Sequence, residues 1–148
     1  MASIKPLLPL IVALSIFGGG QAIASDAPAV TVYKTPTCGC CGKWAAHLQA
    51  NGFDVTTKDL NDLSPIKAEQ KVPPRLASCH TAIVDGYVIE GHIPADIIHR
   101  LLKERPPVVG LAVPGMPAGS PGMEVGYKQP YQVLSFDEDG KIEVYATR

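Results

Sequence analysis

The sequence has no excess of positive charge and no long run of one charge sign. Its 13 Lys and Arg residues are balanced by 14 Asp and Glu residues, which gives a formal net charge of -1. Nucleic-acid-binding proteins concentrate basic residues, and proteins held on membrane surfaces commonly carry polybasic clusters. The composition therefore argues against a nucleic-acid partner and against an electrostatic membrane contact.

Several familiar catalytic motifs are also missing. The chain contains no Gly-rich phosphate-binding loop, no Gly-x-Ser-x-Gly nucleophile motif and no paired-carboxylate site. Phosphoryl transfer and serine-hydrolase chemistry therefore have no support in the sequence. Four cysteines in 148 residues are also too few for a disulfide-dense scaffold.

A long apolar run occurs only near the N-terminus. Residues 7–17 are mostly apolar, follow Lys5 and precede the small-x-small sequence 22–24. This pattern predicts a secretory signal peptide over residues 1–24 that is cleaved near Ala24. The alternative, a membrane anchor, is disfavoured because a transmembrane helix needs about 20 apolar residues. We expect residues 25–148 to form one exported domain without a membrane span.

Local patterns predict the element order β-α-β-α-β-β-α in the first part of this domain. The expected strands span residues 29–34, 53–60, 81–84 and 87–90, and the expected helices span 43–51, 64–71 (with Ser64 as N-cap) and 94–105. Asp85-Gly86 predicts a hairpin turn. This order predicts an α/β fold of the thioredoxin-like class, a mixed sheet flanked by helices on both faces.

The C-terminal part has a different composition. Eleven of the 25 residues in 106–130 are Pro or Gly, which predicts a long loop with little regular structure. Two alternating stretches around an Asp-Gly turn predict a β-hairpin over residues 131–146. We expect this hairpin either to extend the sheet or to fold beside it.

The most informative motif is a cluster of three cysteines after the first strand. Cys38 and Cys41 have the Cys-x-x-Cys spacing of thioredoxin-type oxidoreductases, and Cys40 is an addition to that motif. The start of a helix favours thiolates. Three thiolates within four positions concentrate more negative charge than disulfide exchange requires, and a soft cation would neutralise it. The cluster therefore indicates a site for Cu(I), zinc or an iron–sulfur centre.

The fourth cysteine, Cys79, is followed by His80 and by the third expected strand. In a thioredoxin-like topology this segment lies beside the loop that carries the cysteine cluster, so four sulfurs and one imidazole are expected to converge. Two alternatives remain open on the residues alone. One is a pair of structural disulfides that link Cys79 to the cluster, and the other is a four-coordinate structural zinc site.

The remaining candidates are single residues. His92 follows a strand and precedes Pro94, which favours a surface position over a ligand role. Of the helical histidines, His47 is expected to be solvated and His99 to be solvated or half-buried, and Trp44 is expected in the core. The Pro/Gly-rich loop carries two methionines that serve either as packing anchors or as soft copper ligands. They are Met116 and Met123.

Four stretches together resemble the CopG-type periplasmic proteins, small thioredoxin-like proteins associated with bacterial copper-resistance clusters. The stretches are 35–44, 77–82, 90–96 and 115–124. The resemblance implies a periplasmic protein of copper tolerance that holds more than one Cu(I) in a thiolate cluster. It assigns the ligand role to the four cysteines and places His80 beside them, with Met116, Met123 and His92 as further candidate contributors.

We therefore expect a copper-binding protein that sequesters Cu(I), with interconversion of Cu(I) and Cu(II) as a further hypothesis. Whether the chain is an enzyme stays open. The first alternative is a thiol–disulfide oxidoreductase in which Cys38 is the nucleophile and Cys41 the resolving thiol. The second is a metallochaperone that passes copper to other periplasmic copper-handling proteins without changing its valence.

Overall fold

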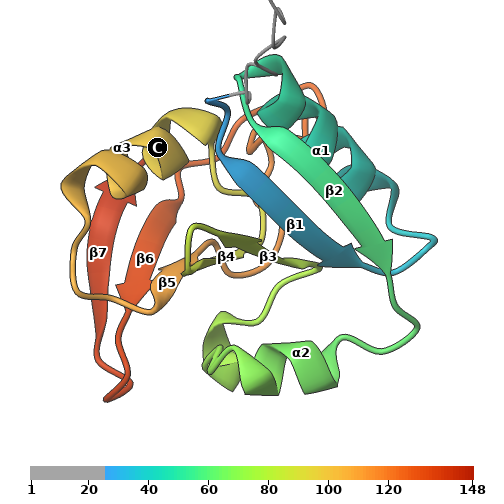
Figure 1. Cartoon of the computed structure of the whole chain (residues 1–148). Coiled ribbons are helices and arrows are strands. Elements are labelled where there is room, and N and C mark those ends of the chain that lie inside the picture. Colours follow the sequence, from blue (N-terminus) through green and yellow to red (C-terminus); the bar gives the residue numbers. More distant parts are fainter. Residues whose placement is uncertain (1–25) are drawn as a thin grey trace, which may run out of the picture.

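The computed structural model describes residues 26–148 (Figure 1). The signal peptide predicted over 1–24 lies outside the described residues. The strands are β1 (Ala29–Lys34), β2 (Asp54–Asp59), β3 (Thr81–Val84), β4 (Tyr87–Glu90), β5 (Gly110–Ala112), β6 (Gln132–Phe136) and β7 (Ile142–Thr147). The helices are α1 (Gly39–Ala50), α2 (Ser64–Glu69), a short 3-10 helix (Pro74–Leu76) and α3 (Ala95–Glu104).

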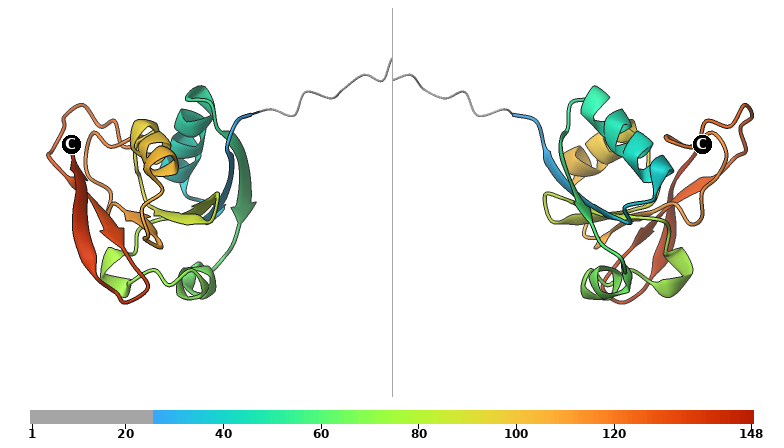
Figure 2. Two further views of the ribbon diagram at one scale, coloured as in Figure 1. Left: turned by 60° about the vertical axis from the view of Figure 1, so that its left-hand side comes forward. Right: turned by 90° about the vertical axis from the view of Figure 1, so that its right-hand side faces the viewer.

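The seven strands in residues 26–148 form one mixed sheet in the order β2-β1-β3-β4-β5-β6-β7. Strand β1 is parallel to β2, and β4 is parallel to β5, while the other neighbouring strands are antiparallel. Helices α1 and α3 cover one face of the sheet and α2 lies on the other (Figures 1 and 2). The predicted α/β fold of the thioredoxin-like class is therefore confirmed, including helices on both faces.

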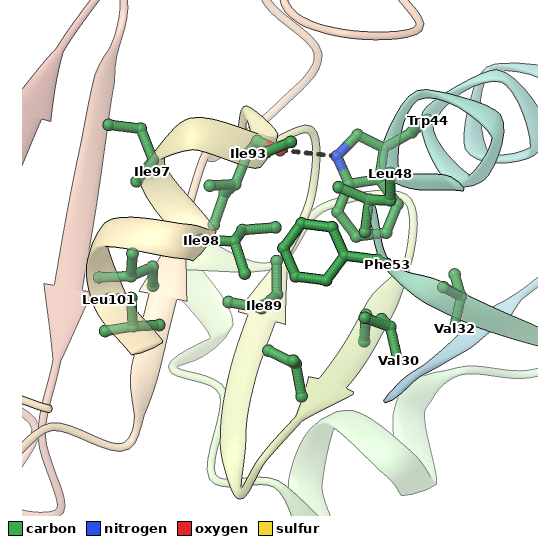
Figure 3. Close-up of a cluster of buried hydrophobic side chains, with 14 of the residues drawn as sticks. Val30, Val32, Trp44, Leu48, Phe53, Ile89, Ile93, Ile97, Ile98 and Leu101 are labelled. Carbon is green, nitrogen blue, oxygen red and sulfur yellow. Dashed lines mark hydrogen bonds between the residues drawn. The ribbon is translucent and has the colours of Figure 1, made fainter. Parts of the chain in front are cut away.

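The larger core fills the space between the sheet and the helices α1 and α3 (Figure 3). Trp44 and Leu48 of α1 meet Ile98 of α3 there, and all three side chains are fully buried. The indole N–H of Trp44 donates a hydrogen bond of 2.8 Å to the carbonyl oxygen of Ile93, so the buried ring has its polar atom satisfied. The predicted core position of Trp44 is confirmed.

A smaller core lies on the opposite face. Its buried members are Val72, Leu76, Val88, Ala112 and Phe136. The 3-10 helix supplies Leu76, and Phe136 comes from the C-terminal hairpin. This core therefore connects two distant parts of the chain, the 3-10 helix that precedes Cys79 and the C-terminal hairpin of β6 and β7.

The prediction of a loop throughout 106–130 is wrong at residues 110–112, which form β5. This strand pairs with β4 on one side and with β6 on the other. Gly110 and Ala112 have low strand propensity, so the strand exists because both neighbouring strands offer it hydrogen-bonding edges. As a result, the C-terminal hairpin extends the sheet, which was one of the two expected arrangements.

Two helix starts differ from the prediction. Helix α1 begins at Gly39 rather than near Lys43, so its first turn contains Cys40 and Cys41. Helix α2 has Leu63 rather than Ser64 at its N-cap, because the Asp62 carboxylate accepts the Ser64 backbone N–H at 2.9 Å. Among residues 26–148, none of the helices has both the length and the apolar character needed to cross a membrane.

Candidate metal centre

The first half of the candidate site, here called the helix half, consists of Cys38, Cys40 and Cys41. Cys38 is the N-cap of α1, and no acidic residue lies in the first turn of this helix. Cys38 and Cys41 form a disulfide, whereas Cys40 is a free thiol with its Sγ 3.5 Å from that of Cys38. The positive end of the helix dipole favours thiolates at these positions when the cysteines are reduced.

The second half, here called the strand half, consists of Cys79, His80 and His92. Cys79 and His80 immediately precede β3, and His92 follows β4. The Sγ atoms of all four cysteines lie within 4.8 Å of one another, and the ligand atoms of Cys79, His80 and His92 do so as well. Cys79 therefore belongs to both groups. Cys40 and Cys79 are free, so the alternative of two structural disulfides is not realised.

His92 is fully buried, so its predicted surface position is wrong. Its Nδ1 atom lies 2.7 Å from the carbonyl oxygen of Pro121, and its Nε2 atom lies 2.9 Å from the Sγ of Cys79. A carbonyl oxygen only accepts hydrogen bonds, so Nδ1 carries the proton and Nε2 presents its lone pair to the sulfur. This orientation is the one that metal-binding histidines commonly have.

His80 is also fully buried, but it is held differently. Its Nδ1 atom lies 3.4 Å from the Sγ of Cys79, while Nε2 is buried without a hydrogen-bond partner among the described residues. Its ring lies against Trp44, with ring centroids 4.3 Å apart, and edge-on to His92. His80 is therefore positioned by ring packing, whereas His92 is positioned by a hydrogen bond.

The Pro/Gly-rich segment closes over the first turn of α1. Gly122, at φ +86°, approaches so closely that a Cβ atom would lie 2.7 Å from the carbonyl oxygen of Cys40. The Cys40 thiol donates to the Sδ of Met116 at 3.8 Å, and Met116 is 50% exposed. Met123 is half-buried, and the hydrogen bonds described for it are made by its backbone. The structure thus brings Met116 to the sulfurs, whereas Met123 supports the turn beside them.

Burial dominates the electrostatics of the strand half. Burial, together with the neighbouring Cys40, raises the pKa of the Cys79 thiol to about 12. Burial also lowers the pKa of His92, and it lowers that of His80 strongly. Without a metal ion, the thiol is protonated and both imidazoles are neutral at neutral pH. A bound cation would displace the thiol proton, because thiolate is the ligand form.

A buried polar group beside the strand half was missed by the sequence analysis. Glu90, at the end of β4, is fully buried and is paired with Lys67 of α2. Burial raises the pKa of the Glu90 carboxyl, and Lys67 opposes that shift. An acidic residue that ends an otherwise apolar strand was the available sequence signal.

The other two histidines lie outside the site. The Nε2 atom of His47 accepts the backbone N–H of Ala95 at 3.2 Å, and the Nε2 atom of His99 lies 2.9 Å from the carbonyl oxygen of Asn51. His99 is exposed, as expected, whereas His47 is half-buried rather than solvated, because it contacts the start of α3. Both histidines connect α1 and its C-terminal turn to α3.

The donor set fits soft and borderline cations. Thiolate and thioether sulfur suit Cu(I), and imidazole nitrogen suits copper or zinc. Four cysteine sulfurs, two imidazoles and the Met116 sulfur exceed the four ligands that one tetrahedral zinc ion uses. The arrangement therefore offers donors for more than one metal ion once the Cys38–Cys41 disulfide is reduced.

Comparison with known proteins gives consistent results. A family model described as a protein of unknown function, DUF411, matches residues 76–123. Two solved structures, named copper resistance protein CopG form 2 and form 1, are each 45% identical to the chain with a TM-score of 0.79. The matches cover 83% of this chain and 99% and 98% of those chains, respectively. A search of curated protein sequences gives no match.

Proposed function

The chain belongs to the CopG family of copper resistance proteins, and from this membership we propose that it is a periplasmic copper-binding protein of copper resistance. Its cargo is Cu(I), with more than one ion per chain. Cys38, Cys40, Cys41 and Cys79 are the thiolate ligands, and His80 and His92 are the nitrogen donors closest to them. The convergence of four cysteine sulfurs within 4.8 Å is the observation that supports this proposal most directly.

Copper loading at all four sulfurs requires reduction of the Cys38–Cys41 disulfide. Two electrons and two protons convert this disulfide into two thiols, and the thiols lose their protons when they bind metal. Oxidation of Cu(I) to Cu(II) releases one electron. Two such oxidations therefore balance the reduction of one disulfide, and this stoichiometry is the basis for proposing that the protein interconverts Cu(I) and Cu(II).

The test is metal content and copper valence of anaerobically reduced protein titrated with Cu(I). We expect more than one Cu(I) per chain in the wild type and a lower stoichiometry in Cys40→Ser. Cys40 is the useful position because it lies outside the Cys38–Cys41 disulfide, so its replacement removes one sulfur and leaves both members of that redox pair in place. Wild-type protein with that disulfide retained is the control. Equal stoichiometry in the wild type and C40S would contradict a shared thiolate cluster.

A thiol–disulfide oxidoreductase is the second candidate function, and one observation favours it. The Cys38–Cys41 disulfide lies at the start of α1, where a helix terminus lowers thiol pKa values and so activates the attacking sulfur. This function predicts reduction of a protein disulfide by metal-free reduced protein, loss of that activity in Cys38→Ser, and no response to copper. Absence of activity in the metal-free wild type would remove it.

A further inference from the structure

The side chain of Glu90 is an unusual feature for the end of a buried strand. It is fully buried, and its carboxylate accepts hydrogen bonds from three donors. They are the ammonium group of Lys67, the backbone N–H of Ser78 at 2.6 Å and the hydroxyl of Thr81 at 2.7 Å. Removing a carboxylate from water is costly unless strong hydrogen bonds replace its hydration. Glu90 meets that requirement entirely with groups around the strand half of the site.

The two neutral donors stand on either side of the residues that carry the site. Ser78 immediately precedes Cys79, and Thr81 immediately follows His80. The carbonyl oxygen of His80 also accepts the backbone N–H of Gly91 at 3.2 Å. The Glu90 carboxylate therefore fixes both ends of the four-residue segment 78–81. The backbone of Gly91, the residue after Glu90, fixes the segment near its middle.

Close packing limits any other arrangement of this segment. Gly91 has φ +77°, and a Cβ atom there would lie 2.7 Å from the Oγ of Ser78 and 2.6 Å from the carbonyl oxygen of Val113. Lys67 donates hydrogen bonds to both Glu90 and Thr81. The Thr81 hydroxyl is therefore a shared partner of the Lys67 ammonium group and the Glu90 carboxylate. Removing the carboxylate would leave donors unpaired on both sides of Cys79.

We propose that Glu90 is a positioning residue that acts through Ser78 and Thr81 to hold Cys79 and His80 against the helix half. Its effect on copper rests on the proposed function. Glu90 does not touch the cysteine sulfurs. It contributes by fixing the position of Cys79, the ligand that the two halves share. Outer partners of metal ligands commonly contribute in this way, because they fix ligand orientation before the metal arrives.

Ser78 allows this role to be separated from a neighbouring one. Its hydroxyl donates to the carbonyl oxygen of Gly115 at 2.6 Å, which ties the segment to the loop that carries Met116. Ser78→Ala breaks that link but keeps the backbone N–H that Glu90 accepts. Thr81→Val does the opposite, because it removes one donor to Glu90 and keeps the link to Gly115.

The decisive variant replaces the whole buried ion pair. Lys67→Met with Glu90→Met removes the acceptor without leaving a buried charge, and apolar replacement of buried ion pairs is often neutral for stability. E90Q is the single-site variant, and E138Q is its matched control. Glu138 is paired with Lys71 at 3.0 Å on the surface, so the same change there removes an exposed ion pair.

The readouts are the Cu(I) affinity by chelator competition and the number of sulfur neighbours per copper by X-ray absorption. We expect K67M/E90M to fold but to unfold at a lower temperature than the wild type, because the Ser78 N–H and the Thr81 hydroxyl lose their acceptor. It should bind Cu(I) roughly 10–100-fold more weakly and with fewer sulfur neighbours. T81V should show a smaller change of the same kind, and E138Q should match the wild type. Wild-type copper coordination in a stable K67M/E90M would overturn the proposal.

A metal-free measurement separates this proposal from the proposed function. With the Cys38–Cys41 disulfide intact, only Cys40 and Cys79 can be alkylated. If Glu90 fixes the segment, K67M/E90M should increase the alkylation rate of Cys79 relative to that of Cys40. Failure of the wild type to bind copper would refute the proposed function, and the alkylation ratio would then decide the role of Glu90. An unchanged ratio would refute that role.

Discussion

The two halves of the site consist of different chemical groups. The helix half is three sulfurs on the first turn of α1, two of them joined in a disulfide and the third in contact with an exposed methionine. The strand half combines one half-buried sulfur with two fully buried imidazoles. Its backbone is fixed by the buried carboxylate of Glu90. One half can change its covalent state, whereas the other is held in place by hydrogen bonds and packing.

This difference separates two tasks that a copper-handling site must perform. Disulfide exchange needs accessible sulfur near a positive helix end, and the helix half offers it. Selective binding needs ligands whose orientation is set in advance, and the strand half offers them. Cys79 connects the two tasks, because its sulfur belongs to both groups of converging ligand atoms.

Loss of the shared sulfur should have the largest effect. We expect Cys79→Ser to weaken Cu(I) binding by more than roughly 100-fold, since losing an outer-shell partner alone costs up to that much. Cu(I) titration against a competing chelator measures it. C40S, which removes a sulfur from the helix half alone, is the matched comparison. If C79S retained more copper than C40S, Cys79 would not be the shared ligand.

The next largest effect should be a dependence of copper affinity on pH. Burial raises the pKa of Cys79 to about 12, so at every pH from 6 to 8 the metal must displace a proton from this thiol. Apparent affinity should then rise about tenfold per pH unit for each proton displaced, because one pH unit corresponds to about 1.4 kcal/mol. Affinity measured at three pH values, with proton release followed by calorimetry in two buffers, tests this. A flat profile would contradict it.

The two histidines of the strand half should differ in importance. His92 has its Nδ1 hydrogen fixed by Pro121, whereas the Nε2 atom of His80 has no partner among the described residues. We therefore expect His92→Gln to weaken Cu(I) binding roughly 10–100-fold and His80→Gln to weaken it less. Chelator competition gives the affinities, and X-ray absorption shows the loss of nitrogen neighbours. The reverse order would indicate that ring packing orients the better ligand.

Much of this arrangement follows from local sequence. The alternation in residues 29–34 predicts β1 with the bounds that the structure has, and the Asp85-Gly86 turn predicts the hairpin of β3 and β4. The β-α-β-α-β-β-α order then brings Cys79 to the cysteine cluster, because β1 and β3 are neighbours in the sheet. Here the local patterns and the topology agree.

Three features that the sequence analysis missed depend on contacts between distant segments. His92 was placed on the surface because a histidine before Ile93-Pro94 shows no local reason for burial, yet Pro121 covers it from 29 residues away. Strand β5 depends on both of its neighbours, and the carboxylate of Glu90 depends on Lys67 of α2, which is 23 residues away in the sequence. No local pattern contains these contacts.

The smallest effect concerns the contact that holds α1, the helix with the three clustered cysteines, against α3. His47 links α1 to the start of α3 by accepting the Ala95 backbone N–H, and burial lowers its pKa in the folded state. The unfolded chain then binds more protons below about pH 6.5, so this contribution to stability is complete above that pH and declines as the pH falls. His47→Gln keeps an acceptor for the N–H but does not titrate.

Between pH 7.5 and 5, the free energy of unfolding of the wild type should therefore fall more than that of H47Q. The difference should be only a few tenths of a kcal/mol, because His47 is half-buried and solvent screens its charge. Urea unfolding of both proteins at each pH measures this difference, and the other buried histidines cancel because both proteins contain them. Parallel curves over this range would show that the Ala95 contact does not depend on the protonation of His47.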